Sequence, residues 1–313
     1  MKKRNEVIII LSLITFAAIV LAVPETIFVD PTPTSSIITS NTSLQINASI
    51  TEANLDSVVY NWNGTNYTFF NNSLVLMMNF NNVSDLGENV THIFDISGSG
   101  NNGTISGAVY NLSGKYGSSV QFDGSNDYAS AADANSLDFG TGGFSFNFWF
   151  NVNGLPSSGS AQLIVKRLSG GGNTELQLSS GVIESYIEGT GQSTRNLKST
   201  YNVTNRLGQW IFVTLNRNSG TAAIYVNGVQ NVSGSSVHNV NNAVALHIGA
   251  DYDGVNPRGE FFNGSIDNLM IFNRSLSDQE IYQLYASTLQ KHNTTYWSLY
   301  VNQSQNTVLL LFD

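Results

Sequence analysis

Paired carboxylates are the first side chains to weigh for chemistry, because two Asp or Glu residues can hydrolyse a glycosidic bond. Glu184 and Glu188 face the same side of a predicted strand, with Tyr186 between them. Four residues of strand span roughly 13 Å, which exceeds the carboxylate separation of either hydrolytic mechanism. We therefore expect Glu184 and Glu188 to be solvated carboxylates on an outer face, and we predict that the chain is not an enzyme.

Nucleophiles and soft metal ligands are scarce in this sequence. The chain has no cysteine and only 4 histidines, none of them in an H-E-x-x-H pattern, and it has no G-x-S-x-G motif. Thiol catalysis, cysteine-ligated zinc, iron–sulfur clusters and a zincin protease are therefore excluded, and no serine triad is indicated.

A sugar-binding surface is the chemistry that the sequence favours, because sugars bind to aromatic rings beside amides and carboxylates. The four phenylalanines at alternate positions of 144–150 predict an inward face, so their neighbours face outward. In the hairpin predicted from 175–178 and 182–188, the leucines and isoleucines face inward. If these strands are neighbours in one sheet, the outward residues form a ligand-binding surface of Asn147, Trp149, Glu175, Gln177, Glu184 and Tyr186. The alternative is that Trp149 packs beneath a loop.

The elements that must position these side chains are β-strands. From about residue 74 to 286, short apolar runs recur between Gly, Asn, Ser and Asp turns, which is typical of a sandwich or barrel. Asn227-Gly228 predicts a type I′ hairpin. One helix is expected, because Ser277 and Glu280 form a capping box with Leu276 and Ile281 as its hydrophobic staple.

The two flanks are predicted as separate units. Residues 23–42 are rich in Pro, Thr and Ser and predict an extended linker. Residues 43–73 hold three short predicted strands, either a partial immunoglobulin-like module or an extension packed on the neighbouring 74–286 domain. Residues 287–313 predict the start of a further β module that is truncated, with a terminal strand as the alternative. We expect residues 74–286 to fold alone.

The N-terminus predicts export. Residues 1–22 join a basic start to a short apolar run, as in a signal peptide or an N-terminal membrane anchor. An extracellular or cell-surface location follows, with membrane contact only through this segment if it is not cleaved. N-x-S/T sequons are frequent, and Asn63, Asn102, Asn202 and Asn263 are candidate glycosylation sites, although an Asn/Ser/Thr-rich chain also produces sequons by chance. The net charge of −9 argues against a nucleic-acid partner.

Seven blocks, in order, resemble those of laminin-G-like, concanavalin-A-like jelly-roll domains. Residues 76–80 with 95–104 resemble the opening, and 115–128 the second block. The later blocks are 144–150 with Gly208-Gln-Trp210, then 224–228, 247–250, 262–267 and 273–281. The resemblance spans about 74–286. It implies an all-β fold, a two-sheet antiparallel jelly-roll sandwich with one short C-terminal helix, here flanked by partial β modules.

The resemblance also bears on catalysis and metal binding. Some relatives on this fold are glycosidases with Glu-x-Asp-x-x-Glu on one strand, and no such string occurs here. Relatives often hold Ca²⁺, which implies Asp251, Asp253 and Asp267 as candidate calcium ligands and calcium as the candidate cofactor. The alternative is that these aspartates cap their own turns.

The function predicted from these observations is a non-catalytic recognition module, carbohydrate-binding or adhesive, with glycans or cell-surface proteins as partners. Two alternatives remain open. One is a structural cell-envelope β protein without a ligand, and the other is an accessory domain of a larger exported glycoside hydrolase.

Overall fold

The computed structural model describes residues 24–33, 38–39, 43–62, 64–156, 159–189, 195–254, 259–304 and 308–309. The predicted leader at 1–22 and the predicted glycosylation site Asn63 lie outside these ranges. Across the residues that are described, no helix is both long enough and apolar enough to span a membrane.

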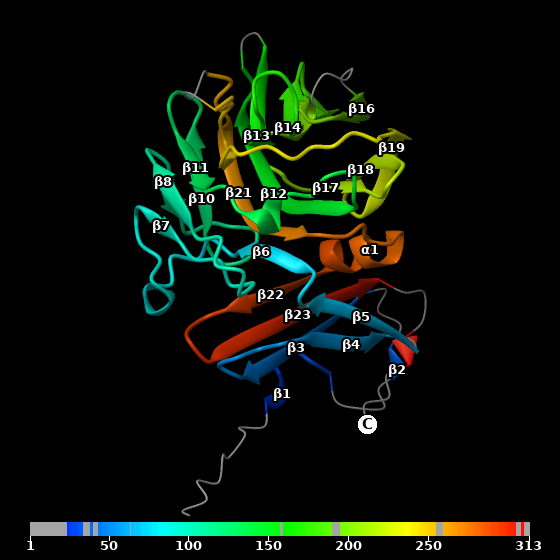
Figure 1. Ribbon diagram of the computed structural model, residues 1–313. Coiled ribbons are helices and arrows are strands. Elements are labelled where there is room, and N and C mark those ends of the chain that lie inside the picture. Colours follow the sequence, from blue (N-terminus) through cyan, green and yellow to red (C-terminus); the bar gives the residue numbers. More distant parts are fainter. Residues whose placement is uncertain are drawn as a thin grey trace, which may run out of the picture.

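Two large antiparallel sheets form a sandwich, as the sequence predicts (Figure 1). The first sheet has the spatial order β19 (Val229–Ser235), β18 (Thr221–Val226), β17 (Trp210–Arg217), β12 (Phe144–Gly154), β21 (Asn263–Phe272), β10 (Ser119–Asp123) and β9 (Val109–Asn111), and β6 (Leu74–Met78) also pairs with β21. The second sheet has the order β16 (Arg195–Asn202), β15 (Val182–Glu188), β14 (Asn173–Ser179), β13 (Ser160–Lys166), β20 (Leu246–Ile248), β11 (Tyr128–Ala131), β8 (Gly103–Ser106) and β7 (His92–Ile93).

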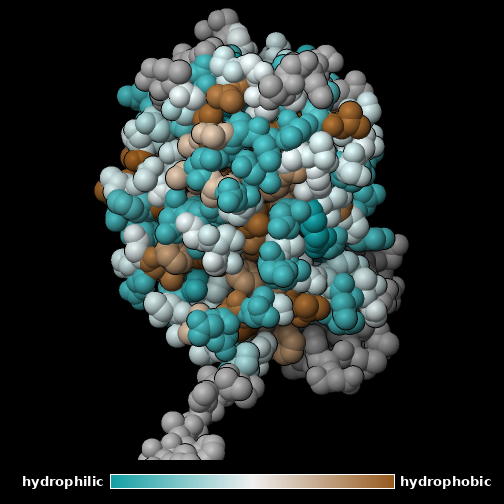
Figure 2. Space-filling model, in the orientation of Figure 1, coloured by the Kyte–Doolittle hydropathy of each residue, from teal (hydrophilic) through white to brown (hydrophobic). Residues whose placement is uncertain are grey.

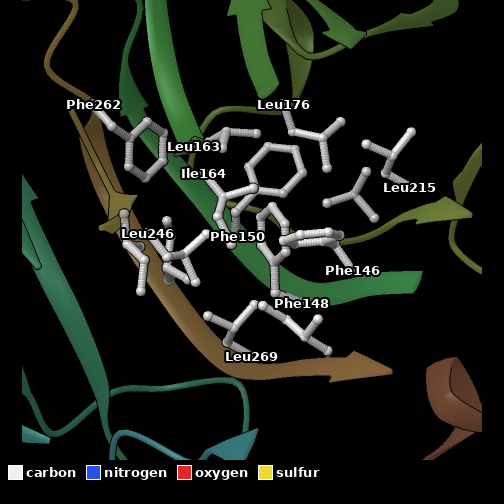
Figure 3. Packing of buried hydrophobic residues seen from close by; sticks show 14 of the residues in the cluster. Phe146, Phe148, Phe150, Leu163, Ile164, Leu176, Leu215, Leu246, Phe262 and Leu269 are labelled. Atoms are coloured by element: carbon white, nitrogen blue, oxygen red, sulfur yellow. The ribbon is translucent and has the colours of Figure 1, made fainter. Parts of the chain in front are cut away.

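The main core lies between these two sheets. All four phenylalanines of 144–150 are at most 2% exposed, so the predicted apolar stripe of β12 is confirmed. They share one buried cluster with Leu176 and Leu178 of β14 and with Ile183 and Ile187 of β15. Figure 3 shows the side chains of β12 on one side of the strand, with leucines and isoleucines packed around them. The inward faces of both sheets are thus those that alternation predicts.

A third layer covers the other face of the first sheet. It consists of a flank sheet with the order β1 (Glu25–Val29), β3 (Ser43–Thr51), β23 (Tyr296–Ser304) and β22 (Ser287–Lys291), the hairpin of β4 (Val58–Trp62) and β5 (Thr65–Phe70), and the helix α1 (Asp278–Ala286). The short strands β2 (Ile38–Thr39) and β24 (Val308–Leu309) pair with each other. Three 3₁₀ turns complete the described structure, at Ser84–Leu86, Asn135–Leu137 and Thr204–Arg206.

The flanks form one layer on the sandwich and not two separate modules, so for residues 43–73 the structure agrees with the alternative of an extension packed on the 74–286 domain. Strand β3 pairs with β23 from Ser43 opposite Ser304 to Thr51 opposite Tyr296, so the N-terminal and C-terminal flanks form one sheet. In Figure 1 the blue and red strands accordingly lie side by side, with α1 between them and the sandwich. Part of the predicted linker also pairs, as β1 with β3. Alternation gives each flank an apolar face, but it does not specify the partner of that face.

The helix and its neighbouring hairpin form as the sequence predicts. The Ser277 hydroxyl accepts a hydrogen bond from the Glu280 amide at 3.2 Å, and the Glu280 carboxylate accepts one from the Ser277 amide at 2.8 Å, which completes the capping box. The predicted turn between β18 and β19 has φ of 50° at Asn227 and 79° at Gly228, as a type I′ turn requires. Together they fix how α1 lies against the first sheet.

Candidate functional site

A hollow of about 310 Å³ lies on the outer face of the second sheet. Strands β13, β14 and β15 form its floor, and the segment that precedes β21 borders it. Polar side chains dominate its lining, which consists of Ser160, Gln162, Arg167, Asn173, Glu175, Gln177, Tyr186, Glu188 and Glu260. We call this feature the polar hollow.

The pairing of β14 with β15 brings the floor of the polar hollow together. Glu175 lies opposite Tyr186, and Asn173 lies opposite Glu188, where the Asn173 amide donates to the Glu188 carboxylate at 2.9 Å. Gln177 lies opposite Glu184. Because side chains alternate along a strand, the leucines and isoleucines between these residues face the core while the polar ones face outward.

Gln162 lies at the centre of the hydrogen bonds in the hollow. Its Nε2 lies 3.3 Å from a Glu175 oxygen, 3.1 Å from the Gln177 carbonyl oxygen and 3.2 Å from a Glu260 oxygen. A bulge in β13 after Gln162 leaves Leu163 and Ile164 both in the core. The backbone N–H of Gln162 donates to the backbone carbonyl of Glu260 at 2.8 Å, so Glu260 is held beside the sheet. Bulges often re-aim side chains next to functional sites.

Ion pairs neutralise only some of the charge around the hollow. Arg167 donates to Asp251 at 2.8 Å and lies 3.7 Å from Glu175. Lys198 pairs with Glu184 at 2.7 Å on the neighbouring strand. Glu184 is only 3% exposed, so the expectation that it is a solvated carboxylate is wrong. Its burial follows from the cover that Lys198, Gln177 and Tyr186 provide.

Glu175 is the titratable group whose environment stands out in the hollow. Burial raises the pKa of its carboxyl to about 7, against the opposing effect of the Arg167 guanidinium, and the charges of Asp251 and Glu260 raise it further. Burial and the neighbouring Glu184 carboxylate also raise the pKa of the Tyr186 phenol. Glu175 therefore changes its charge near neutral pH.

The structure divides the six predicted ligand-binding residues between two sheets. Glu175, Gln177, Glu184 and Tyr186 lie on adjacent strands of the second sheet at or beside the polar hollow, and their binding role stays a prediction. Asn147 and Trp149 lie on β12 of the first sheet, so the assumption that β12 neighbours the hairpin is wrong. The six residues therefore do not form one ligand-binding surface.

Trp149 is covered, as the alternative interpretation expects, by the helix α1 as well as by the loop that holds Lys115 and Tyr116. It is 3% exposed, and its ring stacks on Tyr285 of α1 at a centroid distance of 5.6 Å. The Lys115 ammonium lies 4.2 Å from the centre of the Trp149 ring. Asn147 is fully buried, and its side-chain oxygen accepts a hydrogen bond from Thr214 at 2.9 Å. Both side chains face away from the main core and are covered by the flanks.

The predicted calcium ligands do not come together. Asp251 and Asp253 follow β20, whereas Asp267 is buried in the first sheet beside Tyr116, whose amide donates to it at 2.9 Å. Burial raises the pKa of Asp267 well above its usual value. Asp251 is held by Arg167. Among the residues that the structure describes, no group of three or more His, Asp or Glu side chains could hold a metal ion.

The remaining predicted sites are the sequons. Asn102 and Asn202 are exposed, while Asn263 is half-buried at the start of β21. The side-chain oxygens of Asn102 and Asn202 accept hydrogen bonds from nearby amides, at 2.8 Å from Asp95 and 2.7 Å from Thr204. Glycosylation at these asparagines stays a prediction.

Sequence reasoning missed the other half of the hollow. Strand parity placed Glu188 on the outer face, although it was not included in the predicted ligand-binding set, and the same parity could have added Asn173. Gln162 was hidden, because the bulge in β13 breaks the alternation. Arg167 and Glu260 come from loops, and no periodic signal marks a loop residue as a neighbour of a sheet.

Comparison with protein families gives one match. The description of that family is the Concanavalin A-like lectin/glucanases superfamily, and it matches residues 123–282. No match to this sequence is found among curated proteins.

Solved structures share the fold at low sequence identity. The binding domain of Paraclostridial Mosquitocidal Protein 1 has a TM-score of 0.56 and 17% identity over 68% of this chain and 52% of its own. The binding domain of Botulinum Neurotoxin DC in complex with SialylT has a TM-score of 0.52 and 18% identity, over 68% of this chain and 51% of its own. Domain 4 of AbnA, a GH43 extracellular arabinanase from Geobacillus stearothermophilus in complex with arabinotriose, has 0.53 and 19%, over 68% of this chain and 98% of that domain. The chain therefore spans about half the length of the toxin domains.

Proposed function

The chain belongs to the concanavalin A-like lectin/glucanase superfamily, and we propose that it is a non-catalytic recognition module that binds carbohydrate in the polar hollow. The observation that carries this proposal is the hollow itself, in which amides, carboxylates and one aromatic ring converge on the outer face of the second sheet. A volume of about 310 Å³ is at the lower end of the range for small-molecule sites, which suits one or two sugar rings.

The lining offers the groups that sugar recognition uses. Sugar hydroxyls donate and accept hydrogen bonds, and carboxylates and amides complement both roles. Tyr186 is half-buried in the floor and supplies a ring against which the apolar face of a sugar can pack. The complexes of two fold relatives with arabinotriose and with SialylT support this proposal, although they concern those proteins.

We propose an extracellular or cell-surface location, which rests on the leader predicted at 1–22. Glycans or glycosylated surface proteins are then the accessible partners. Adhesion follows if the glycan is on another cell.

A glycan array probed with the full chain tests the binding proposal, followed by titration calorimetry on the best saccharide. Tyr186→Ala should weaken that binding by about tenfold, the equivalent of a lost ring contact. Tyr296→Ala is the matched control, because Tyr296 is 36% exposed on β23, in the third layer. An array without hits would contradict the proposal and favour a structural β protein without a ligand.

Catalysis is tested with the same saccharides. Glu175 and Glu260 both contact Gln162 Nε2, so a carboxyl group of raised pKa lies near a second carboxylate. Time-dependent release of reducing ends that Glu175→Gln abolishes would contradict the non-catalytic part of the proposal. We expect no release above that of the buffer.

A further inference from the structure

The polar hollow has an excess of negative charge. Among the described residues, the carboxylates of Glu188 and Glu260 line it together with the Arg167 guanidinium, and the Glu175 carboxyl adds a third negative charge above about pH 7. Arg167 forms an ion pair with Asp251 at 2.8 Å, which largely neutralises its charge. The Glu184 carboxylate beside the hollow is matched by Lys198. The charge that a ligand meets is therefore negative, which disfavours an acidic ligand.

The hollow also has more hydrogen-bond acceptors than donors. Gln162 Nε2 carries two hydrogens but lies within hydrogen-bond distance of three acceptors, on Glu175, Gln177 and Glu260. At least one of these oxygens receives no hydrogen from Gln162. A donor group on a ligand can supply this hydrogen.

A buried acceptor without a partner points the same way. Gln162 is 1% exposed and lines the hollow, and its Oε1 has no hydrogen-bond partner among the described residues. A buried acceptor without a partner destabilises the folded state, so one is seldom left without a role. Because Gln162 Oε1 is uncharged, it indicates a missing donor without relying on the charge of the carboxylates.

We propose that the polar hollow selects a saccharide that carries a protonated amine, such as an amino sugar, over neutral and acidic saccharides. The proposal rests on the proposed carbohydrate-binding function and names its ligand class. An ammonium group has three donors, no acceptor and a positive charge, so it matches both the surplus of acceptors and the surplus of negative charge. Glu188 and Glu260, at the rim, are the carboxylates that an incoming amine reaches first, because Glu175 is 7% exposed.

The test compares three tetrasaccharides of equal length by titration calorimetry with the full chain. The probes are tetramers of glucosamine, of N-acetylglucosamine and of galacturonic acid, at a pH low enough to protonate the amine. We expect the glucosamine tetramer to bind at least about fivefold more tightly than the acetylated one, as one partly solvated ion pair allows. Added salt should weaken only the first.

Two variants assign the preference to the hollow. Glu188→Gln and Glu260→Gln should each weaken binding of the glucosamine tetramer by a larger factor than binding of the N-acetylglucosamine tetramer, so that the preference for the amine falls. Glu25→Gln removes the same charge from exposed strand β1 and should change neither affinity. Melting curves of the variants show that they fold.

The outcomes separate this inference from the function on which it rests. Equal affinity for the cationic and neutral tetramers, or tighter binding of the acidic one, overturns the amine preference and leaves carbohydrate binding intact. Loss of the preference in Glu25→Gln to the same extent as in Glu188→Gln also overturns it, because the effect would then be that of net charge. Binding of no saccharide on the array or in the calorimeter overturns both proposals.

Discussion

Trp149 and Tyr186 are alike in the sequence and opposite in the structure. Both face away from the main core by strand parity, and both lie among polar residues. Trp149 is covered by α1 and by Lys115, whereas Tyr186 is half-buried in the floor of the polar hollow. A residue that faces away from the main core is therefore exposed to solvent only where the third layer does not cover its sheet. The role of each ring depends on that cover.

Replacing the covered ring should affect stability alone. We expect Trp149→Ala to lower the free energy of unfolding by about 3–5 kcal/mol, because it leaves a large cavity beside Phe212 and Tyr285. Saccharide affinity of the folded fraction should stay within twofold of the parent, a change of about 0.4 kcal/mol. Urea denaturation and calorimetry measure the two quantities. A large loss of affinity with unchanged stability would place the binding surface on the first sheet.

Glu175 should make stability depend on pH. Burial raises its pKa from 4.5 to about 7, so between these values the folded chain binds more protons than the unfolded one. The stability that the group contributes is therefore full below about pH 4.5 and is lost as the pH rises through about 7, with a total of about 3 kcal/mol. The free energy of unfolding of Glu175→Gln, measured relative to the parent at the same pH, should therefore be higher at about pH 8 than at about pH 5.

The control for this pH dependence is Glu25→Gln, which removes a carboxylate from exposed strand β1. Its difference from the parent in urea denaturation should be the same at both pH values. A Glu175→Gln difference that is equally flat would show that the carboxyl titrates as an ordinary exposed glutamate, and the buried environment described above would then be incorrect.

At the scale of the elements, the turn of the β18–β19 hairpin lies in close contact with α1. A Cβ added at Gly228 would lie 3.2 Å from Tyr282 and from Tyr285, and the residue has φ of 79°. The turn itself was predicted from Asn227-Gly228. Its contact with the helix was not, because a turn signal specifies backbone dihedrals and not the neighbour across space.

Gly228→Ala should therefore destabilise the chain by two effects at once. We expect a loss of about 2 kcal/mol, of which about 1 is backbone strain and the rest displacement of α1. Gly208→Ala separates the two effects, because Gly208 has φ of 76° and no atom within 4 Å of the added Cβ. Thermal or urea unfolding of both variants measures the difference, and equal losses would contradict the proposed contact with the helix.

Elements with strong local signals were predictable, and their partners were not. The capping box of α1 and the inward phenylalanines of β12 follow from spacing alone, and both are confirmed. The pairing of β3 with β23 joins segments from opposite ends of the chain, which no local pattern encodes. Four of the six predicted ligand-binding residues lie at or beside the hollow, because parity holds within one hairpin, but it did not identify which sheet β12 enters.

At the scale of the whole molecule, three layers share two apolar interfaces. The second interface combines Trp149 and Phe272 of the first sheet with Trp297 of the flank sheet and Ile281 of α1 in one buried cluster. A network of buried amides reinforces it, in which Asn79 donates to Asn268 at 2.8 Å and Gln290 also donates to Asn268. The predicted unit of 74–286 keeps α1 but lacks the flank sheet and the β4–β5 hairpin on that side of the interface.

The flank sheet should therefore contribute to global stability. We expect a chain of residues 43–304 to unfold in a single cooperative transition, and a chain of 74–286 to be less stable and to bind a dye specific for exposed apolar surface. Calorimetry and dye fluorescence make the comparison. Equal melting temperatures would show that the sandwich folds alone, as the sequence by itself suggested.

Most apolar residues on the face that Figure 2 shows are scattered among polar ones, so this face of the folded chain offers few large patches for association. The same is not true during synthesis. Strand β12 leaves the ribosome long before β23, and on the order of ten seconds separates Trp149 from Trp297 at ordinary elongation rates. Throughout that interval the outer face of the first sheet lacks the part of its cover that β22 and β23 supply. The joining of the two flanks thus makes β23 a condition for a fully covered first sheet, and a chain released before β23 is made would be prone to aggregate.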